Sequence, residues 1–280
     1  MSAQPQIAFD KMVFRKTNAH VGRHISITPA NSTMRHLAYG RIILNASTPA
    51  AAFSNGESET GLICLAGSAD VKIGAENFRL GQYDAIYIPR DSHIEVKTGG
   101  QADIAEFSSD VERRYPVQFV SYAEISKDPT LRMIVGAAPA ARDLSILIGK
   151  NVNAGRLLAG FTVSEPGNWT SWPPHEHEKM LEEMYVYFHM PEPAFAIQLV
   201  YKNTDYPELV TVVRDGDAVL MPGGYHPNVS IPGHRICFLW AMAAHREIED
   251  RQFGVVNVQP AFDQGKSGLE ASLPGQASLK

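Results

Sequence analysis

The feature of this sequence that most constrains its fold is an internal repeat. The segments "GQYDAIYIPRDSHIEV" (Gly81–Val96) and "RDGDAVLMPGGYHPNV" (Arg214–Val229) carry the same pattern, displaced by 133 residues. The shared positions are Asp84, Pro89 and His93 in the first copy and Asp217, Pro222 and His226 in the second. Each copy contains a turn, a short strand-forming run and a second turn. Because the pattern occurs only twice, it indicates a duplicated domain and not a solenoid.

The segments around both copies favour β structure. The runs "TGLICLAGSADVKIG", "EMYVYFHM", "FAIQLVYKN", "ELVTVV" and "RICFLWAMA" are rich in β-branched and aromatic residues and are bounded by Gly, Pro, Asp or Asn. Helical signals are few, and "YAEISKDPTLRMIV" is the best candidate for a short helix. Many short strands separated by turns predict an all-β protein with two tandem β-barrel domains.

Composition places the domain boundary and the ends of the second barrel. The stretch "DPTLRMIVGAAPAARD" is rich in small residues and prolines, so we predict a first barrel over residues 1–135 and a second over 136–262. Residues 1–30 are expected to be an extension packed on the first barrel. The small, polar segment 263–280 is expected to be a flexible tail.

Charge and cysteine content exclude several classes of protein. A net charge of −5 over 280 residues argues against nucleic-acid and membrane-surface binding. The longest apolar run, Ile236–Ala244, has nine residues, whereas a membrane span needs about 20. Cys64 and Cys237 lie in apolar runs, which predicts buried free thiols. With no export signal recognised in its N-terminal segment, we expect a cytoplasmic protein.

The stretch "SWPPHEHEKMLEEMYVYF" (Ser171–Phe188) carries the clearest chemical signal. Residues i and i+2 of a strand point to the same face, so His175 and His177 would present parallel imidazoles. The second repeat copy supplies His226 from another strand. An isolated His-x-His is short and common in solvated turns. The strand-forming run after the glutamates, the independently placed His226 and the stiff Pro173-Pro174 approach together favour a metal site.

Two adjacent glutamates compete for the carboxylate position. Glu182 and Glu183 point to opposite faces of a strand, so only one can reach the site. Glu183 shares its face with Tyr185 and Tyr187, and we predict it as the ligand. Three imidazoles and one carboxylate suit Zn²⁺, Mn²⁺, Fe²⁺ or Ni²⁺. The first copy has no His-x-His upstream, so His93 is expected to be a structural or surface residue and the first barrel to lack metal ligands.

His-x-His, a following Glu and then Gly-Asp…Pro-Gly…His resemble the two-part cupin signature. The segments "GNWTSWPPHEHEKMLEEMYVYF" and "RDGDAVLMPGGYHP" are similar to the bicupin sugar-acid isomerase family, over roughly residues 25–260. That family contains 5-deoxy-glucuronate isomerase of inositol breakdown and 5-keto-4-deoxyuronate isomerase of pectin breakdown. The resemblance implies two cupin (jelly-roll) barrels, a metal bound by His175, His177, Glu183 and His226, and aldose–ketose isomerisation of a deoxy uronic acid.

Within that family the motifs divide. "EEMY" and "GDAVLMPGGYHP" resemble the 5-deoxy-glucuronate enzyme, whereas "LGQYDAIYIPRD" and "FLWAMAAHREIED" resemble the ketodeoxyuronate enzyme. The first is the preferred prediction, with a divalent ion, Zn²⁺ before Mn²⁺ or Fe²⁺. An Fe²⁺ dioxygenase and a non-catalytic sugar-binding protein remain alternatives of other classes. Pairing through edge strands would give a homo-oligomer.

The sequence does not identify the proton-transfer base or the partner of the substrate carboxylate. Three strand residues could line the cavity, although core packing is the commoner role for such side chains: Tyr185, Tyr187 and Gln198. Three cations lie nearby in the sequence, although each is more often a solvated surface charge: Lys202, Arg214 and Arg235.

Overall fold

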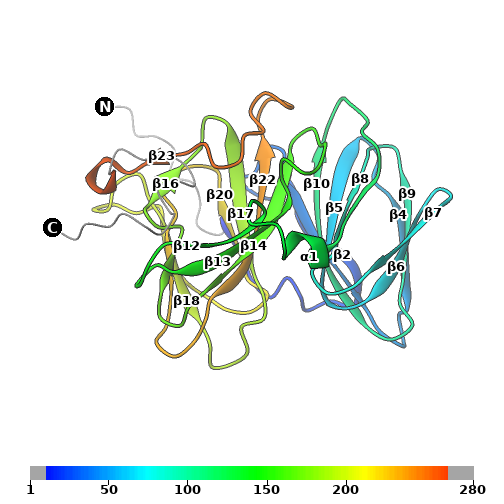
Figure 1. The fold of residues 1–280 in the computed structure, drawn as a ribbon, viewed down its shortest axis with the longest axis horizontal. Helices are drawn as coiled ribbons and strands as arrows, with labels where there is room; N and C mark the ends of the chain where they lie inside the picture. Colours follow the sequence, from blue (N-terminus) through cyan, green and yellow to red (C-terminus); the bar gives the residue numbers. More distant parts are fainter. Residues whose placement is uncertain (1–10, 264–280) are drawn as a thin grey trace.

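A computed structural model describes residues 11–263 as two β-barrels that lie side by side (Figure 1). The blue and cyan strands of the first half form one barrel, and the green to orange strands of the second half form the other. In each barrel a large antiparallel sheet and a smaller one enclose apolar side chains. The predicted all-β, two-barrel architecture is therefore confirmed.

The first barrel consists of a six-stranded and a four-stranded sheet. The larger sheet has the order β11 (Gln118–Val120), β8 (Ala85–Ile88), β5 (Ser58–Gly67), β10 (Ala102–Asp110), β3 (Ala38–Leu44), β2 (Gly22–Ile27). The smaller has the order β4 (Ala50–Ser54), β9 (His93–Lys97), β6 (Ala69–Ile73), β7 (Glu76–Leu80).

The second barrel consists of a seven-stranded, a four-stranded and a two-stranded sheet. The largest has the order β1 (Val13–Phe14), β20 (Ala218–Met221), β17 (Leu181–Tyr187), β22 (Cys237–Ala244), β14 (Leu157–Ser164), β13 (Arg142–Ile148), β12 (Arg132–Val135). The next has the order β15 (Trp169–Thr170), β21 (Asn228–Ser230), β18 (Ala196–Val200), β19 (Leu209–Val213). The smallest pairs β16 (His175–Glu176) with β23 (Asn257–Val258).

Helical structure is sparse in the described residues. The helix α1 (Tyr122–Ile125) lies inside the segment predicted to hold a short helix, and the 3₁₀ turn η2 (Pro260–Phe262) follows β23. Neither is long and apolar enough to cross a membrane. Cys64 and Cys237 are buried and free, as predicted.

Strand alternation assigns one face of each large sheet to a barrel core and the other to the contact between barrels. In β3 and β10, Ile42 and Ile104 pack inside the first barrel, whereas Tyr39 and Phe107 join the cluster that includes the second barrel. The Tyr83 and Phe161 rings, one from each half, lie 4.8 Å apart. Because both faces are covered, these strands carry apolar side chains on both faces.

The repeated Asp has the same local role in both barrels. Asp84 accepts a hydrogen bond from the Gly81 N–H (2.8 Å), and Asp217 accepts one from the Arg214 N–H (3.0 Å). Each carboxylate therefore stabilises the turn before its strand. The second oxygen of Asp84 also accepts the Tyr122 N–H at the start of α1. The repeat is thus a conserved turn geometry between the two halves and not in itself a chemical motif.

Two buried carboxylates join the barrels reciprocally. Glu59 of β5 accepts hydrogen bonds from three consecutive backbone N–H groups of the second barrel, and Glu182 of β17 accepts three from the first. The donors, at 2.7–2.8 Å, are Gly155, Arg156 and Leu157 for Glu59, and Arg35, His36 and Leu37 for Glu182. Both side chains are at most 1% exposed. Such charge-assisted bonds fix the position of β17, the strand that also carries Glu183.

Two details of the predicted organisation need correction. The prediction that residues 1–30 pack on the first barrel is wrong for β1, because Val13 and Phe14 pair with β20 of the second barrel. Strand β12, assigned to the first domain, pairs with β13 of the second. The division into domains stays a prediction, but this pairing favours a boundary close to Pro129. The predicted tail, apart from Asp263, lies outside the described residues.

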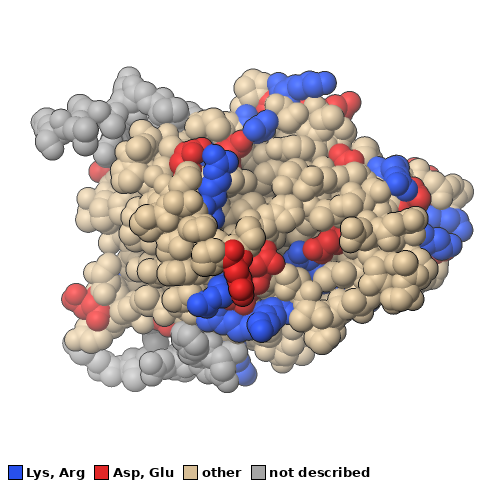
Figure 2. Space-filling model, turned by 90° about the horizontal axis from the view of Figure 1, so that it is seen from below, with Lys and Arg blue, Asp and Glu red and all other residues tan. Residues whose placement is uncertain are grey.

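The surface carries mixed charge. On the face shown in Figure 2, acidic and basic side chains lie near one another in small groups. Exposed ion pairs include Arg79 with Asp70 (2.8 Å) and Arg246 with Glu249 (2.6 Å). This pattern differs from the basic surface of a single sign that binds nucleic acid.

We predict that Glu182→Gln destabilises the protein by about 2 kcal/mol, because an amide group replaces one acceptor oxygen and faces backbone N–H donors without bonding them. Chemical unfolding followed by fluorescence measures the change. Glu59→Gln should have an effect of similar size. The control is Glu165→Gln, since Glu165 is 59% exposed in its pair with Arg235, and such a pair contributes about 0.5 kcal/mol or less. Equal effects of Glu182→Gln and Glu165→Gln would contradict the prediction.

Candidate metal centre

A cavity of about 100 Å³ lies inside the second barrel. Strands β13, β14, β17 and β22 provide one wall, and the chain between Phe253 and Val258 provides another. Because β23 pairs with β16, this C-terminal segment lies against the stretch that carries His175. The cavity wall therefore combines strands of the barrel with the C-terminal segment Phe253–Val258.

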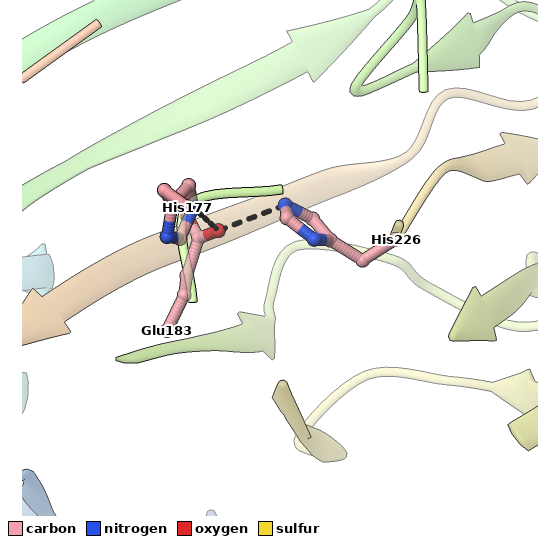
Figure 3. Close-up of side chains that lie close together, drawn as sticks. All are labelled: His177, Glu183 and His226. Atoms are coloured by element: carbon pink, nitrogen blue, oxygen red, sulfur yellow. Dashed lines mark hydrogen bonds and ion pairs between the residues drawn. The ribbon is translucent and has the colours of Figure 1, made fainter. Parts of the chain in front are cut away.

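His177, Glu183 and His226 converge beside this cavity, as Figure 3 shows. The Nε2 atoms of His177 and His226 lie 3.1 Å and 3.0 Å from the same oxygen, Oε2 of Glu183. The ligand-type atoms of these residues all lie within 4.8 Å of one another, and the three side chains are at most 5% exposed. Among residues 11–263 this is the one such group, and it lies in the barrel where the sequence predicts a metal site.

The backbone orients the imidazoles. Nδ1 of His177 lies 3.1 Å from the Leu181 carbonyl, and Nδ1 of His226 lies 2.8 Å from the Gly224 carbonyl. A carbonyl oxygen only accepts hydrogen bonds, so each Nδ1 carries the proton and donates it. Nε2 of each ring is therefore the atom that faces Glu183, and Nε2 of His177 donates to that carboxylate when the ring is protonated. Metal-binding histidines in proteins are held by the same kind of second hydrogen bond.

Burial and mutual charge determine the ionisation of the group. Burial alone would raise the pKa of the Glu183 carboxyl, but the adjacent imidazoles of His177 and His226 outweigh it and hold that pKa at about 2. Burial alone would lower the pKa of His177, yet the hydrogen bond and charge of Glu183 outweigh it and raise that pKa. The arrangement therefore favours a carboxylate beside positive charge.

His175 lies next to this group without joining it. Its ring centroid is 5.1 Å from that of His226 and 6.5 Å from that of His177, and its Nδ1 lies 2.8 Å from the Pro173 carbonyl. The ring lines the same cavity. Burial and the neighbouring His226 lower the pKa of His175 to about 3. The structure thus brings three of the four predicted ligands together, and the fourth stays a prediction.

The geometry separates the roles of the two glutamates. Glu182 and Glu183 face opposite sides of β17, and the carboxylate of Glu182 is engaged by three N–H groups of the other barrel. Glu183 is the carboxylate that faces the two histidines. His93, in the first barrel, is exposed, with Nδ1 3.3 Å from the Ser54 hydroxyl.

The sequence candidates for the cavity wall divide into two groups. Tyr185 lines the cavity, and its hydroxyl lies 2.6 Å from that of Ser171. Tyr187 and Gln198 do not line it and instead bond each other at 2.5 Å. The Gln198 side-chain amide donates to the His226 carbonyl (3.0 Å), so this pair supports the loop that carries His226.

The cations considered from the sequence lie away from the cavity. Lys202 pairs with Glu178 (3.0 Å) and Arg235 with Glu165 (3.3 Å), while Arg214 lies 6.0 Å from the Phe195 ring centroid. The basic side chain that does line the cavity is Arg142, which sequence reasoning missed. The only signal in the sequence was its place at the start of an apolar strand-forming run, "RDLSILI".

The rest of the wall is largely apolar and aromatic. Trp240 stacks on Phe253 of the C-terminal segment, with centroids 5.0 Å apart and an interplanar angle of 26°. On its other side the indole lies against Gly160, where an added Cβ would come within 2.3 Å of the ring and 2.1 Å of the Ser145 carbonyl oxygen. Glycine at this position lets the ring lie close to β14. The cavity therefore has a polar cluster within a rigid apolar wall.

Solved structures share this arrangement of two barrels. An IolB-like protein from Salmonella typhimurium superposes with a TM-score of 0.78 at 23% identity, over 89% of this chain and 96% of that one. Oxalate decarboxylase of Bacillus subtilis, in a study of its Mn(II) centres, superposes with a TM-score of 0.62 at 15% identity, over 90% and 80% of the two chains. The fold and the histidine–carboxylate cluster together define a protein of the bicupin class.

The model of the KduI/IolB family matches residues 12–257, so the chain belongs to the KduI/IolB family. The 5-deoxy-glucuronate isomerase of Geobacillus kaustophilus is 28% identical over 204 residues, which are 67% of this chain and 72% of the relative. The 4-deoxy-L-threo-5-hexosulose-uronate ketol-isomerase of Opitutus terrae is 28% identical over 200 residues, 68% of each chain. The family resemblance stated from the motifs is confirmed.

We predict that the chelator-treated protein loses stability as the pH falls, and that His175→Gln reduces this loss. Because the folded pKa of His175, about 3, lies below the unfolded value of 6.5, unfolding takes up a proton between these limits. The contribution of His175 is present above pH 6.5 and is lost as the pH falls towards 3. Between pH 7.5 and 4.5 it amounts to about 2–3 kcal/mol. Urea unfolding at the two pH values measures it.

Glu183 adds to the same loss at lower pH, since its depressed pKa gives stability that disappears between pH 4.5 and about 2. His177, with a raised pKa, acts in the opposite direction around neutral pH. The control is His93→Gln, which alters an exposed histidine. A His175→Gln protein whose stability falls in parallel with the wild type would show that His175 does not contribute.

Proposed function

We propose that this protein is a metal-dependent aldose–ketose isomerase acting on a deoxy uronic acid, with 5-deoxy-glucuronate as its first candidate substrate. The observation that carries the proposal is the convergence of two buried Nε2 atoms and one carboxylate oxygen beside a cavity of a KduI/IolB-family chain. Several relatives from Geobacillus and Bacillus bear the name 5-deoxy-glucuronate isomerase. Isomerisation of the hexosulose uronate named for the Opitutus relative is the alternative.

The donor set fits a divalent cation. Nε2 of His226 lies 3.0 Å from the Glu183 oxygen without hydrogen-bond geometry, and it has no other partner among the described residues. A buried imidazole nitrogen left without a partner is costly, whereas a cation shared with His177 and Glu183 would satisfy all three atoms. His175, whose ring is adjacent, is proposed as the fourth ligand. Imidazole and carboxylate donors suit Zn²⁺ first, and Mn²⁺ or Fe²⁺ next.

When bound, such an ion would polarise the carbonyl and neighbouring hydroxyl oxygens of the open-chain sugar and stabilise the negative charge that develops on them. The chain's own residues would orient the substrate and exclude water. Burial raises the pKa of Tyr185 well above its usual value, so its phenol keeps its proton at neutral pH. Its O–H is therefore available beside His226 as a hydrogen-bond donor to a substrate oxygen. Trp240 and Phe253 close the apolar side of the cavity.

Further parts of the proposal rest on the family's chemistry. A 5-deoxy-glucuronate isomerase would serve inositol catabolism, take a small-molecule sugar acid and work in the cytoplasm. A homo-oligomer remains part of the proposal, since edge strands such as β19 and β12 offer backbone groups for pairing.

We predict about one divalent metal ion per chain in the native protein, with loss of most of it in His177→Ala, His226→Ala and Glu183→Gln. Each substitution removes one of the converging donor atoms, so turnover should fall by more than about 100-fold, beyond the loss typical of residues behind the ligands. Elemental analysis and a coupled isomerase assay measure the two effects. His93→Ala is the control and should retain both metal and activity. Equal metal loss in His93→Ala would contradict a single centre in the second barrel.

The identity of the metal and of the substrate distinguishes this function from its rivals. Zinc or manganese together with interconversion of 5-deoxy-glucuronate and its ketose, followed by proton exchange into the product, supports the isomerase. Iron with substrate-dependent oxygen uptake would indicate a dioxygenase. Retained metal and sugar binding without conversion of any uronic acid would indicate a binding protein.

A further inference from the structure

Arg142 places a buried positive charge in the wall of the cavity that holds the histidine–carboxylate cluster. It is the first residue of β13, it is 7% exposed, and it is the one Lys or Arg among the described residues that line the cavity. Its guanidinium donates to the Ala140 carbonyl (2.8 Å) and the Trp172 carbonyl (2.9 Å). Burial lowers the pKa of Arg142 to about 10, so the side chain is still protonated at neutral pH.

We propose that Arg142 binds the carboxylate of the sugar acid and selects uronic acids over neutral sugars, with the reacting end of the open chain at the cluster of His177, Glu183 and His226. This assignment rests on the proposed function and adds a specificity-determining residue to it. The geometry of a guanidinium matches a carboxylate through two parallel N–H donors.

Tyr185 connects the cluster to Arg142 through a short chain of contacts. The Tyr185 ring lies 5.8 Å from the His226 ring on one side, and its hydroxyl bonds Ser171. Ser171 directly precedes Trp172, whose carbonyl holds the Arg142 guanidinium. Contacts thus run from His226 through Tyr185 and the Ser171–Trp172 stretch to Arg142.

Charge then orients the substrate in one direction. Arg142 favours a carboxylate at its own part of the cavity wall, where the guanidinium offers paired N–H donors. The cavity lining also includes Leu144, Phe238 and Trp240, which offer no compensating charge. Because a carboxylate loses strongly favourable hydration when it enters an apolar cavity, it needs a cation within that cavity. A neutral sugar has no such requirement, and this difference is the basis of selectivity.

The backbone contacts of Arg142 hold it ready for this role. The two carbonyls fix the plane of the guanidinium, so little side-chain freedom is lost when a carboxylate binds. The same Trp172 carbonyl belongs to the stretch that leads to His175. A short piece of chain therefore connects the partner of Arg142 with the histidine beside the cluster. Arg142 is therefore a binding residue positioned by the loop that also bears the predicted metal ligands.

The test compares Arg142→Gln and Arg142→Lys with the wild type, each loaded with zinc. We expect kcat/KM for 5-deoxy-glucuronate to fall by about 100-fold in Arg142→Gln, mainly through KM, because a buried charge pair is lost. For the neutral analogue 5-deoxy-glucose the change should be less than about threefold, since that sugar has no carboxylate to pair. Arg142→Lys should lie between the two, because an ammonium keeps the charge but not the paired donors.

Arg251→Gln is the matched control. Arg251 is also largely buried and also donates to two backbone carbonyls, those of Leu157 and Gly149, but it does not line the cavity. It should leave the ratio of kcat/KM values for the acid and the neutral sugar unchanged. Metal content and thermal midpoint, measured for every variant, identify a loss caused by misfolding. Should Arg142→Gln fail to fold, the ratio in Arg142→Lys decides the question.

Binding measurements separate this proposal from the proposed function. Calorimetry with D-gluconate and D-glucitol compares a sugar acid with a neutral polyol without requiring turnover. Gluconate binding that weakens at least tenfold in Arg142→Gln, with glucitol unchanged, supports the carboxylate site even if the wild type isomerises no uronic acid. Equal losses for acid and neutral ligands, or no loss for either, would overturn the assignment of Arg142 while leaving an observed isomerase activity intact.

Discussion

The two buried carboxylates that join the barrels determine where the second barrel can place its chemistry. Glu182 accepts hydrogen bonds from three backbone N–H groups of the first barrel. These bonds fix the position of β17 along its axis and its rotation about that axis. The next residue, Glu183, must then point to the opposite face, into the cavity. A strand held on one face by charge-assisted hydrogen bonds can keep a carboxylate on its other face among imidazoles, where a mobile strand would let it reach water. The contact between the barrels is thus part of the construction of the site.

The duplicated fold kept its structural residues and diverged in its chemistry at neighbouring positions. Glu183 is opposite Met221 in the pairing of β17 and β20, and Thr60 is opposite Ile88 in the pairing of β5 and β8, at the matching place in the repeat. The preceding residues, Glu182 and Glu59, both remain glutamates and both bind the other barrel. One residue position therefore serves the assembly of the barrels, and the next distinguishes a barrel with a carboxylate in its cavity from one without.

Sequence patterns predicted what depends on local chemistry and missed what depends on contacts between distant strands. The repeat and the alternation in strands predicted the two barrels. The His-x-His spacing and the second repeat copy identified His177, Glu183 and His226 as ligand candidates. These features follow from strand geometry and turn chemistry. Arg142 was not found, since an arginine at the start of an apolar strand reads as a surface charge until the sheet is closed around it. The pairing of β1 with the second barrel was missed for a similar reason. A strand of two residues is too short to show a periodic pattern, and its sequence does not indicate which distant strand it pairs with.

The ionisable side chains at the cavity act together on a bound ligand. Each imidazole donates through Nδ1 to a backbone carbonyl, so the Nε2 atoms of His177 and His226 both face the carboxylate of Glu183, and Arg142 supplies positive charge in the wall of the same cavity. In an apolar enclosure charges interact far more strongly than in water. A ligand with a polarisable carbonyl at one end and a carboxylate at the other would match the cluster and Arg142 in one orientation only. The apolar side chains of the wall offer a carboxylate no cationic partner, so its pairing with Arg142 makes that orientation selective.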